Sequence, residues 1–103
     1  MRLAFAPLAE QDLEAIADYI AADNPVRALS FVRELRTQCQ RITLNPPGYR
    51  LRPELGDRIR SCAHGHHVIF FESNSDVVVI VRILHGARDI PAVFGADPES
   101  PLR

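Results

Sequence analysis

A chain of 103 residues has room for one hydrophobic core, which excludes a division into two domains. Its 47% hydrophobic and 24% charged residues are typical of an ordinary globular domain and exclude a disordered or fibrous protein. The net charge of −1 is a poor match for a protein that holds many phosphates, although Arg50, Arg52, Arg58 and Arg60 form a local basic cluster. No run of residues approaches membrane-spanning length.

The first half of the chain predicts a strand followed by two helices. Residues 2–6 are expected to form a short strand that ends at a proline. Apolar residues at helical spacing then predict a helix over residues 8–22, with acidic residues on its other faces. Asn24 and Pro25 are typical of the start of a second helix, which a Pro-Pro-Gly sequence ends. The two helices are expected to form an antiparallel hairpin with one apolar side.

The second half predicts three antiparallel strands, over residues 58–63, 67–72 and 76–84, after an irregular connection over 49–57. The last strand is apolar on both faces, which is typical of a central strand. Simple alternation places one set of its side chains on the sheet face opposite the helices: Val78, Ile80 and Leu84. That face is exposed unless a partner or a later segment, such as Ile90, Val93 and Phe94, covers it.

The sequence therefore predicts an α+β fold of order β-α-α-β-β-β, with a helical hairpin packed on one face of a small, mainly antiparallel sheet. We expect a single domain over residues 1–94 and a disordered tail over residues 95–103, because the tail combines prolines with small and charged residues.

The cysteines and histidines do not predict a metal site. Cys39 and Cys62 lack metal-type spacing, and the lack of an export signal places them in a reducing, cytoplasmic compartment as buried free thiols. His64, His66 and His67 lie close together, but His66 and His67 point to opposite faces if they lie in a strand. We expect neither a metal nor another cofactor.

Metal-free RNA cleavage is the enzymatic alternative, and it needs a base, an acid and cations beside the phosphate. The side chains available for it are Arg58, Arg60, Arg82, His85 and Arg88. No carboxylate base stands out, and the chain contains no lysine. The interpretation that we favour is that Arg82 and Arg88 pair with acids such as Glu72 and Asp89, and that His85 simply ends a strand.

Seven stretches resemble one known family, and they occur in that family's order. They are Phe5-Ala6-Pro7, Asp12-Leu13, Ile16-Ala17-Asp18-Tyr19-Ile20, Asn24-Pro25 with Ala28 and Phe31, Arg52-Pro53-Glu54-Leu55, Val68-Ile69-Phe70-Phe71, and Arg82 through Asp89. Together they resemble the ParE toxins of the RelE/ParE superfamily, which come from type II toxin–antitoxin modules. The most specific pair is Arg52 to Leu55 followed at the right distance by Arg82 to Asp89.

The resemblance implies a toxin that inhibits DNA gyrase without catalysis. It also implies a ParD-like antitoxin encoded by the neighbouring gene, contact with DNA only through that antitoxin, and higher-order toxin–antitoxin oligomers. No catalytic residue is carried over, because ParE proteins generally lack the full set of the RNase branch. Two alternatives stay open: a ribosome-dependent mRNA endoribonuclease of the RelE branch, and a non-toxic binding module that regulates its own operon.

Two groups of residues are expected to contact these partners. For the target, the candidates lie at and just beyond the end of the last strand: Arg82, His85, Arg88 and Asp89. For the antitoxin, the uncovered apolar face and the nearby basic cluster supply the candidates: Val78, Ile80, Arg82, Leu84, Phe70, Arg58 and Arg60.

Overall fold

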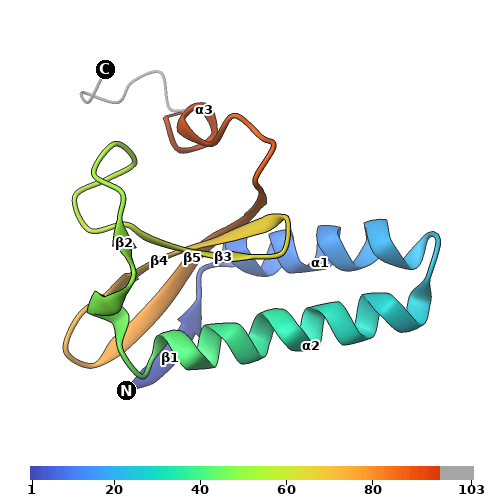
Figure 1. Cartoon of the computed structure of the whole chain (residues 1–103), viewed down its shortest axis with the longest axis horizontal. Coiled ribbons are helices and arrows are strands. Elements are labelled where there is room, and N and C mark those ends of the chain that lie inside the picture. Colours follow the sequence, from blue (N-terminus) through green and yellow to red (C-terminus); the bar gives the residue numbers. More distant parts are fainter. Residues whose placement is uncertain (96–103) are drawn as a thin grey trace.

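The computed structural model describes residues 1–95, so most of the expected tail over 95–103 lies outside the described residues. The elements in chain order are β1 (Arg2–Phe5), α1 (Pro7–Ala21), α2 (Pro25–Ile42), the 3-10 helix η1 (Pro46–Gly48), β2 (Arg50–Leu51), β3 (Arg60–His64), β4 (His67–Ser73), β5 (Val77–His85) and α3 (Ile90–Phe94) (Figure 1). They confirm the predicted α+β class with its helical hairpin on a mainly antiparallel sheet. The structure adds η1, β2 and α3.

The sheet has the strand order β1-β5-β4-β3-β2. β1 pairs with β5 in parallel, and the other neighbouring strands are antiparallel. β5 is an interior strand, paired on both sides with β1 and β4, as its two apolar faces indicate. A two-residue turn joins β3 to β4, and its first residue, Gly65, has a φ of 60°. Glycine adopts this left-handed conformation without the steric cost that a Cβ would bring.

The two long helices begin within one residue of the predicted positions. Pro7 and Pro25 occupy the first turns of α1 and α2, where a missing backbone N–H removes no helical hydrogen bond. The side chain of Asn24 accepts a hydrogen bond from the backbone N–H of Arg27 at 3.0 Å. Asn24 is thus the N-cap of α2, at the turn that joins the two helices.

The hairpin covers one face of the sheet and forms the larger core there. The fully or nearly buried side chains of this core are Ala9, Leu13, Phe31, Leu35, Cys39, Ile42, Cys62, Ile69, Phe71, Val78, Ile80 and Ile83. Both cysteines are buried free thiols, as expected. Burial raises the pKa of Cys39 to about 12.

The opposite face of the sheet is covered by α3 and by the connection between β2 and β3 (Figure 1). The buried side chains on this side are Leu55, Ile59, Phe70, Leu84 and Ile90. The Phe94 ring meets the Phe70 ring edge-on, with 5.0 Å between centroids. A partner therefore cannot contact the whole of this face, because α3 and the β2–β3 connection already cover part of it.

A β-bulge overturns the simple alternation expected along β5. Phe70 pairs with Arg82 but Phe71 pairs with Ile80, so Val81 is the extra residue. Ile80 consequently lies in the core under the helices, whereas Val81 and Leu84 face α3. The prediction that Val78, Ile80 and Leu84 share the face opposite the helices is wrong, because one inserted residue reverses the parity of everything beyond it.

Candidate partner-binding groove

An ion pair between α1 and β5 holds Arg82, one of the residues that line the candidate site, in place. Arg82 donates from Nε to Asp12 Oδ2 at 2.8 Å and from its second terminal nitrogen to Asp12 Oδ1 at 3.0 Å. Asp12 Oδ2 also accepts the backbone N–H of Ile83 at 2.9 Å. The hydrogen bonds that Arg82 donates to Asp12 raise the pKa of Arg82, and two parallel bonds hold its guanidinium in one orientation.

Arg82 therefore pairs with an acid, as the structural interpretation of the sequence expected, but the acid is Asp12 and not Glu72 or Asp89. No local sequence pattern indicates this partner, because Asp12 lies 70 residues away and next to the apolar stripe of α1. The Asp12 carboxylate, whose side chain is only 12% exposed, accepts three hydrogen bonds from β5 and so positions this strand against the hairpin.

A groove runs beside this ion pair, between the start of α1, the end of β5 and α3. Its lining is mostly apolar and consists of Ala6, Pro7, Leu8, Val81, Arg82, Val93 and Phe94. A second hollow continues it past Arg82, lined by Arg82, Arg88, Asp89, Ala92 and Val93. Because the two hollows share Arg82 and Val93, we treat them as one feature, the β5–α3 groove.

Three of the four residues predicted to contact a target come together in the β5–α3 groove: Arg82, Arg88 and Asp89. Asp89 caps α3, because its side chain accepts the backbone N–H of Ala92 at 3.3 Å. Arg88 is exposed and forms no ion pair among residues 1–95. The groove thus combines an apolar floor with an unpaired positive charge at one end, which suits apolar side chains accompanied by an acidic group.

His85, the fourth candidate, lies with the other histidines beside the β3–β4 turn. Its Nδ1 accepts the backbone N–H of Ala87 at 3.0 Å. Its ring stacks on that of His66 and meets that of His67 edge-on, at centroid distances of 6.1 and 5.2 Å. Burial, followed by the charge of His85, lowers the pKa of His67, whose Nδ1 is buried without a hydrogen bond. Across residues 1–95, no group of three His, Cys, Asp or Glu side chains could hold a metal.

The apolar residues predicted to contact an antitoxin are core residues. Val78 and Ile80 have no exposed surface and lie under the helices. Phe70 and Leu84 lie beneath α3. A partner reaches these two side chains only if α3 moves.

The basic residues predicted to contact an antitoxin differ in their exposure and in whether they already bind another part of the chain. Arg60 donates to the backbone carbonyl of Tyr49 at 2.8 Å, so it holds the chain before β2 in place. Arg58 is exposed. Arg82 lines the β5–α3 groove while bound to Asp12. The accessible set is therefore smaller than the sequence predicted.

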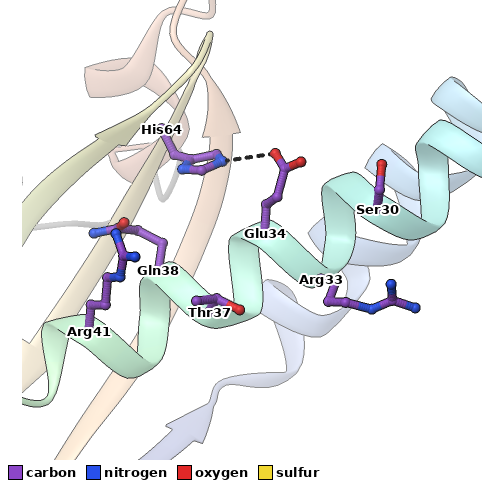
Figure 2. Close-up of a pocket in the computed structure, with 7 residues that line it drawn as sticks. All are labelled: Ser30, Arg33, Glu34, Thr37, Gln38, Arg41 and His64. Atoms are coloured by element: carbon purple, nitrogen blue, oxygen red, sulfur yellow. Dashed lines mark ion pairs between the residues drawn. The ribbon is translucent and has the colours of Figure 1, made fainter.

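A separate pocket lies on the outer side of α2, facing the β3–β4 turn, and none of the predicted site residues lines it. It is lined by Ser30, Arg33, Glu34, Thr37, Gln38, Arg41 and His64 (Figure 2). Glu34 pairs with His64 at 3.6 Å and with Arg27 at 2.7 Å. The hydrogen bond from Arg27 lowers the pKa of Glu34. We interpret this pocket as a surface ion-pair network that holds the turn against α2.

The fold and the groove together define a small α+β protein with a helical hairpin on one face of its sheet and a mostly apolar groove between α1, β5 and α3. Residues 3–90 match the family described as "ParE toxin of type II toxin-antitoxin system, parDE". The chain therefore belongs to the ParE toxin family.

A solved structure, entitled "Chromosomal ParDE TA system from P. aeruginosa", supports the same fold. It is 23% identical, with a TM-score of 0.71 over 82% of this chain and 95% of the solved chain. No curated protein matches this chain. Within the described residues, no helix is both long enough and apolar enough to cross a membrane.

Proposed function

We propose that this ParE-family protein inhibits DNA gyrase in the cytoplasm by binding it, and that a ParD-like antitoxin encoded by the neighbouring gene neutralises it. The observation that carries the proposal is the β5–α3 groove, where an apolar floor adjoins the guanidinium of Arg88, which forms no ion pair with any residue of the described range 1–95. A binding surface of this kind supports inhibition by contact and needs no reacting group. Among the described residues, His85 lies outside the groove lining and so apart from Arg82 and Arg88, which favours binding over RNA cleavage as the role of the groove.

The antitoxin segment that fits the β5–α3 groove is amphipathic and acidic. Its apolar side chains would cover Val81, Val93 and Phe94, and its carboxylates would approach Arg88. A segment that orders only on binding can follow such a groove over a long distance. Gyrase and antitoxin would then compete for Arg88, which explains neutralisation by occlusion.

The gyrase part of the proposal is tested with purified toxin in a supercoiling assay. We expect the wild-type chain to block supercoiling, and Arg88→Glu to lose most of the inhibition because it reverses the charge at the groove. Arg41→Glu is the matched control, since Arg41 is exposed on α2 at a different pocket. Unimpaired gyrase at high toxin excess, with mRNA cut on translating ribosomes, would instead establish the endoribonuclease alternative.

The antitoxin part is tested by calorimetry with the protein encoded by the adjacent reading frame. We expect Val93→Glu to weaken binding, because it places a carboxylate on the apolar floor of the groove. Leu44→Glu is the control, since Leu44 is 83% exposed and lies outside the groove lining. Circular dichroism of both variants establishes that they are folded. Equal affinity of both folded variants would remove the groove from the antitoxin interface.

A further inference from the structure

The four histidines of the chain gather at one end of the sheet. His64, His67 and His85 occupy directly paired positions on β3, β4 and β5, so their side chains form a row on one face. The ring of His66, in the turn between β3 and β4, stacks on that of His85. These four rings lie outside the lining of the β5–α3 groove, so the proposed function gives them no role.

His85 anchors the segment that leads from β5 to Arg88. Its Nδ1 accepts the backbone N–H of Ala87 at 3.0 Å, and its carbonyl oxygen accepts that of Arg88 at 3.1 Å. The backbone N–H of Gly86 donates to the carbonyl oxygen of His66 at 2.7 Å. Three successive N–H groups between β5 and α3 are therefore held by two histidines.

The bond to Ala87 depends on the protonation state of one nitrogen. An imidazole accepts a hydrogen bond only at the nitrogen that carries no proton, and an imidazolium ion has donors at both nitrogens. A proton on Nδ1 of His85 therefore removes the acceptor and sets two donors against each other. Histidine side chains take up such a proton between about pH 8 and pH 5.

The groups next to His85 do not offset an added positive charge. The rings of His66 and His67 lie 6.1 and 5.2 Å from that of His85, centroid to centroid, and can gain only a positive charge themselves. The nearest acid along the chain is Asp89, whose side chain already accepts the backbone N–H of Ala92. Among residues 1–95, no acidic side chain forms an ion pair with His85.

α2 packs against the far end of the row. The ring of Phe31 meets those of His64 and His67 at centroid distances of 5.7 and 5.4 Å. Glu34 pairs with His64 at 3.6 Å, and Arg27 binds the same carboxylate at 2.7 Å. The acid on α2 therefore compensates a proton on His64 and leaves a proton on His85 without a partner.

We propose that His85 is a positioning residue, which holds Arg88 at the end of the β5–α3 groove while its Nδ1 is unprotonated and releases the segment 86–88 when protonated. The inference rests on the proposed function, because Arg88 is the charge that the partner meets in the groove. A charge held in place before binding costs less entropy to use, so release of the segment weakens binding. The new charge on His85 would by itself attract an acidic partner, so the two effects have opposite signs and can be separated.

Two variants represent the two states of His85. In His85→Asn the side-chain oxygen replaces Nδ1 as the acceptor of the Ala87 N–H and does not titrate, whereas His85→Phe keeps a ring without an acceptor. Residue 85 is exposed, so both variants should fold, which circular dichroism checks.

The first measurement is NMR of the free toxin. The nitrogen–nitrogen scalar coupling across the bond between Ala87 and His85 should be present at about pH 7.5 and lost at about pH 5.5. The backbone amide signal of Arg88 should shift with it in the wild type and stay in place in His85→Asn.

The second measurement is calorimetric affinity for the protein encoded by the adjacent reading frame, at the same two pH values. The wild type should bind about tenfold more weakly at the lower pH, relative to His85→Asn with the same partner. His85→Phe should bind about tenfold more weakly than the wild type already at the higher pH. His64→Gln is the control, since His64 belongs to the row but makes no bond to residues 86–88. It should keep the pH dependence of the wild type.

Four results would overturn the proposal. They are a coupling that persists at the lower pH, a pH dependence of affinity that His85→Asn retains, binding that becomes tighter in acid, and loss of the pH dependence in His64→Gln, which would assign it to the charge of the whole row. An Arg88→Glu variant that binds like the wild type would instead remove the proposed function of the groove. The NMR measurement would still decide whether His85 holds the segment.

Discussion

Removing the carboxylate of Asp12 tests whether one side chain joins the hairpin to the sheet. Asp12→Ala removes both hydrogen bonds to Arg82 and the acceptor for the backbone N–H of Ile83. Ile83 is 1% exposed, so water does not replace that acceptor. Asp12→Asn is the informative comparison, because its carbonyl oxygen can still accept the Ile83 N–H while the charge is lost.

The two variants should differ by an amount that the structure lets us work out. A buried N–H left without a partner costs about 1–3 kcal/mol. The pair with Arg82, whose side chain is 20% exposed, contributes about 1 kcal/mol after screening by water. We therefore expect Asp12→Ala to lower the free energy of unfolding by about 3 kcal/mol, and Asp12→Asn by about 1 kcal/mol. In a domain of this size the first loss lowers Tm by about 15 °C.

The measurement is urea unfolding followed by circular dichroism, at one protein concentration. Glu14→Ala is the control on the same helix, because Glu14 is exposed and should change stability by less than about 0.5 kcal/mol. Equal losses for Asp12→Ala and Asp12→Asn would mean that the Ile83 hydrogen bond contributes nothing. A loss for Asp12→Ala no larger than that of the control would refute the whole argument.

Three further predictions concern other parts of the fold. The pKa of His67 is lower in the folded protein than in the unfolded chain, so the unfolded chain binds a proton at His67 at a higher pH. The free energy of unfolding should therefore fall as the pH drops below 6.5. His67→Gln should reduce that fall in urea unfolding curves. Gly65→Ala should cost about 1 kcal/mol in thermal melts, from the backbone alone, because nothing lies within 4 Å of the added Cβ. Cys39, with a pKa of about 12, should resist iodoacetamide at pH 8 until denaturant is added, as mass spectrometry would show; ready alkylation of the folded chain would contradict its burial.

The hairpin and the main strands could be predicted because their signals are local. Helical spacing, proline positions and the Asn24 cap act within a few residues, and the structure confirms them. The two-residue β2 was missed because the pairing of Arg50 with Ser61 gives no periodic signal of its own. α3 was foreseen only as apolar residues that cover the sheet, since five residues are too few to show a helical period.

The site was harder to predict because its geometry depends on contacts between distant residues. Arg82 was singled out as a charge on an apolar strand, but its partner Asp12 comes from the other end of the chain. The bulge at Val81 moved Ile80 to the helix side, and no local pattern announces an inserted residue. His85 and Arg88 are three residues apart in sequence, yet only Arg88 lines the β5–α3 groove.

The parallel pairing of β1 with β5 has a consequence for synthesis on the ribosome. β1 leaves the exit tunnel before the other strands, yet its hydrogen-bonding partner, β5, is the last strand along the chain. Contacts between such distant segments form late, because a long loop must close before they contribute any stability. The β5–α3 groove needs the start of α1 and the end of β5 at once. A nascent chain therefore cannot display this surface until nearly the whole domain has emerged from the tunnel, so the groove forms in one late step of the folding of this domain.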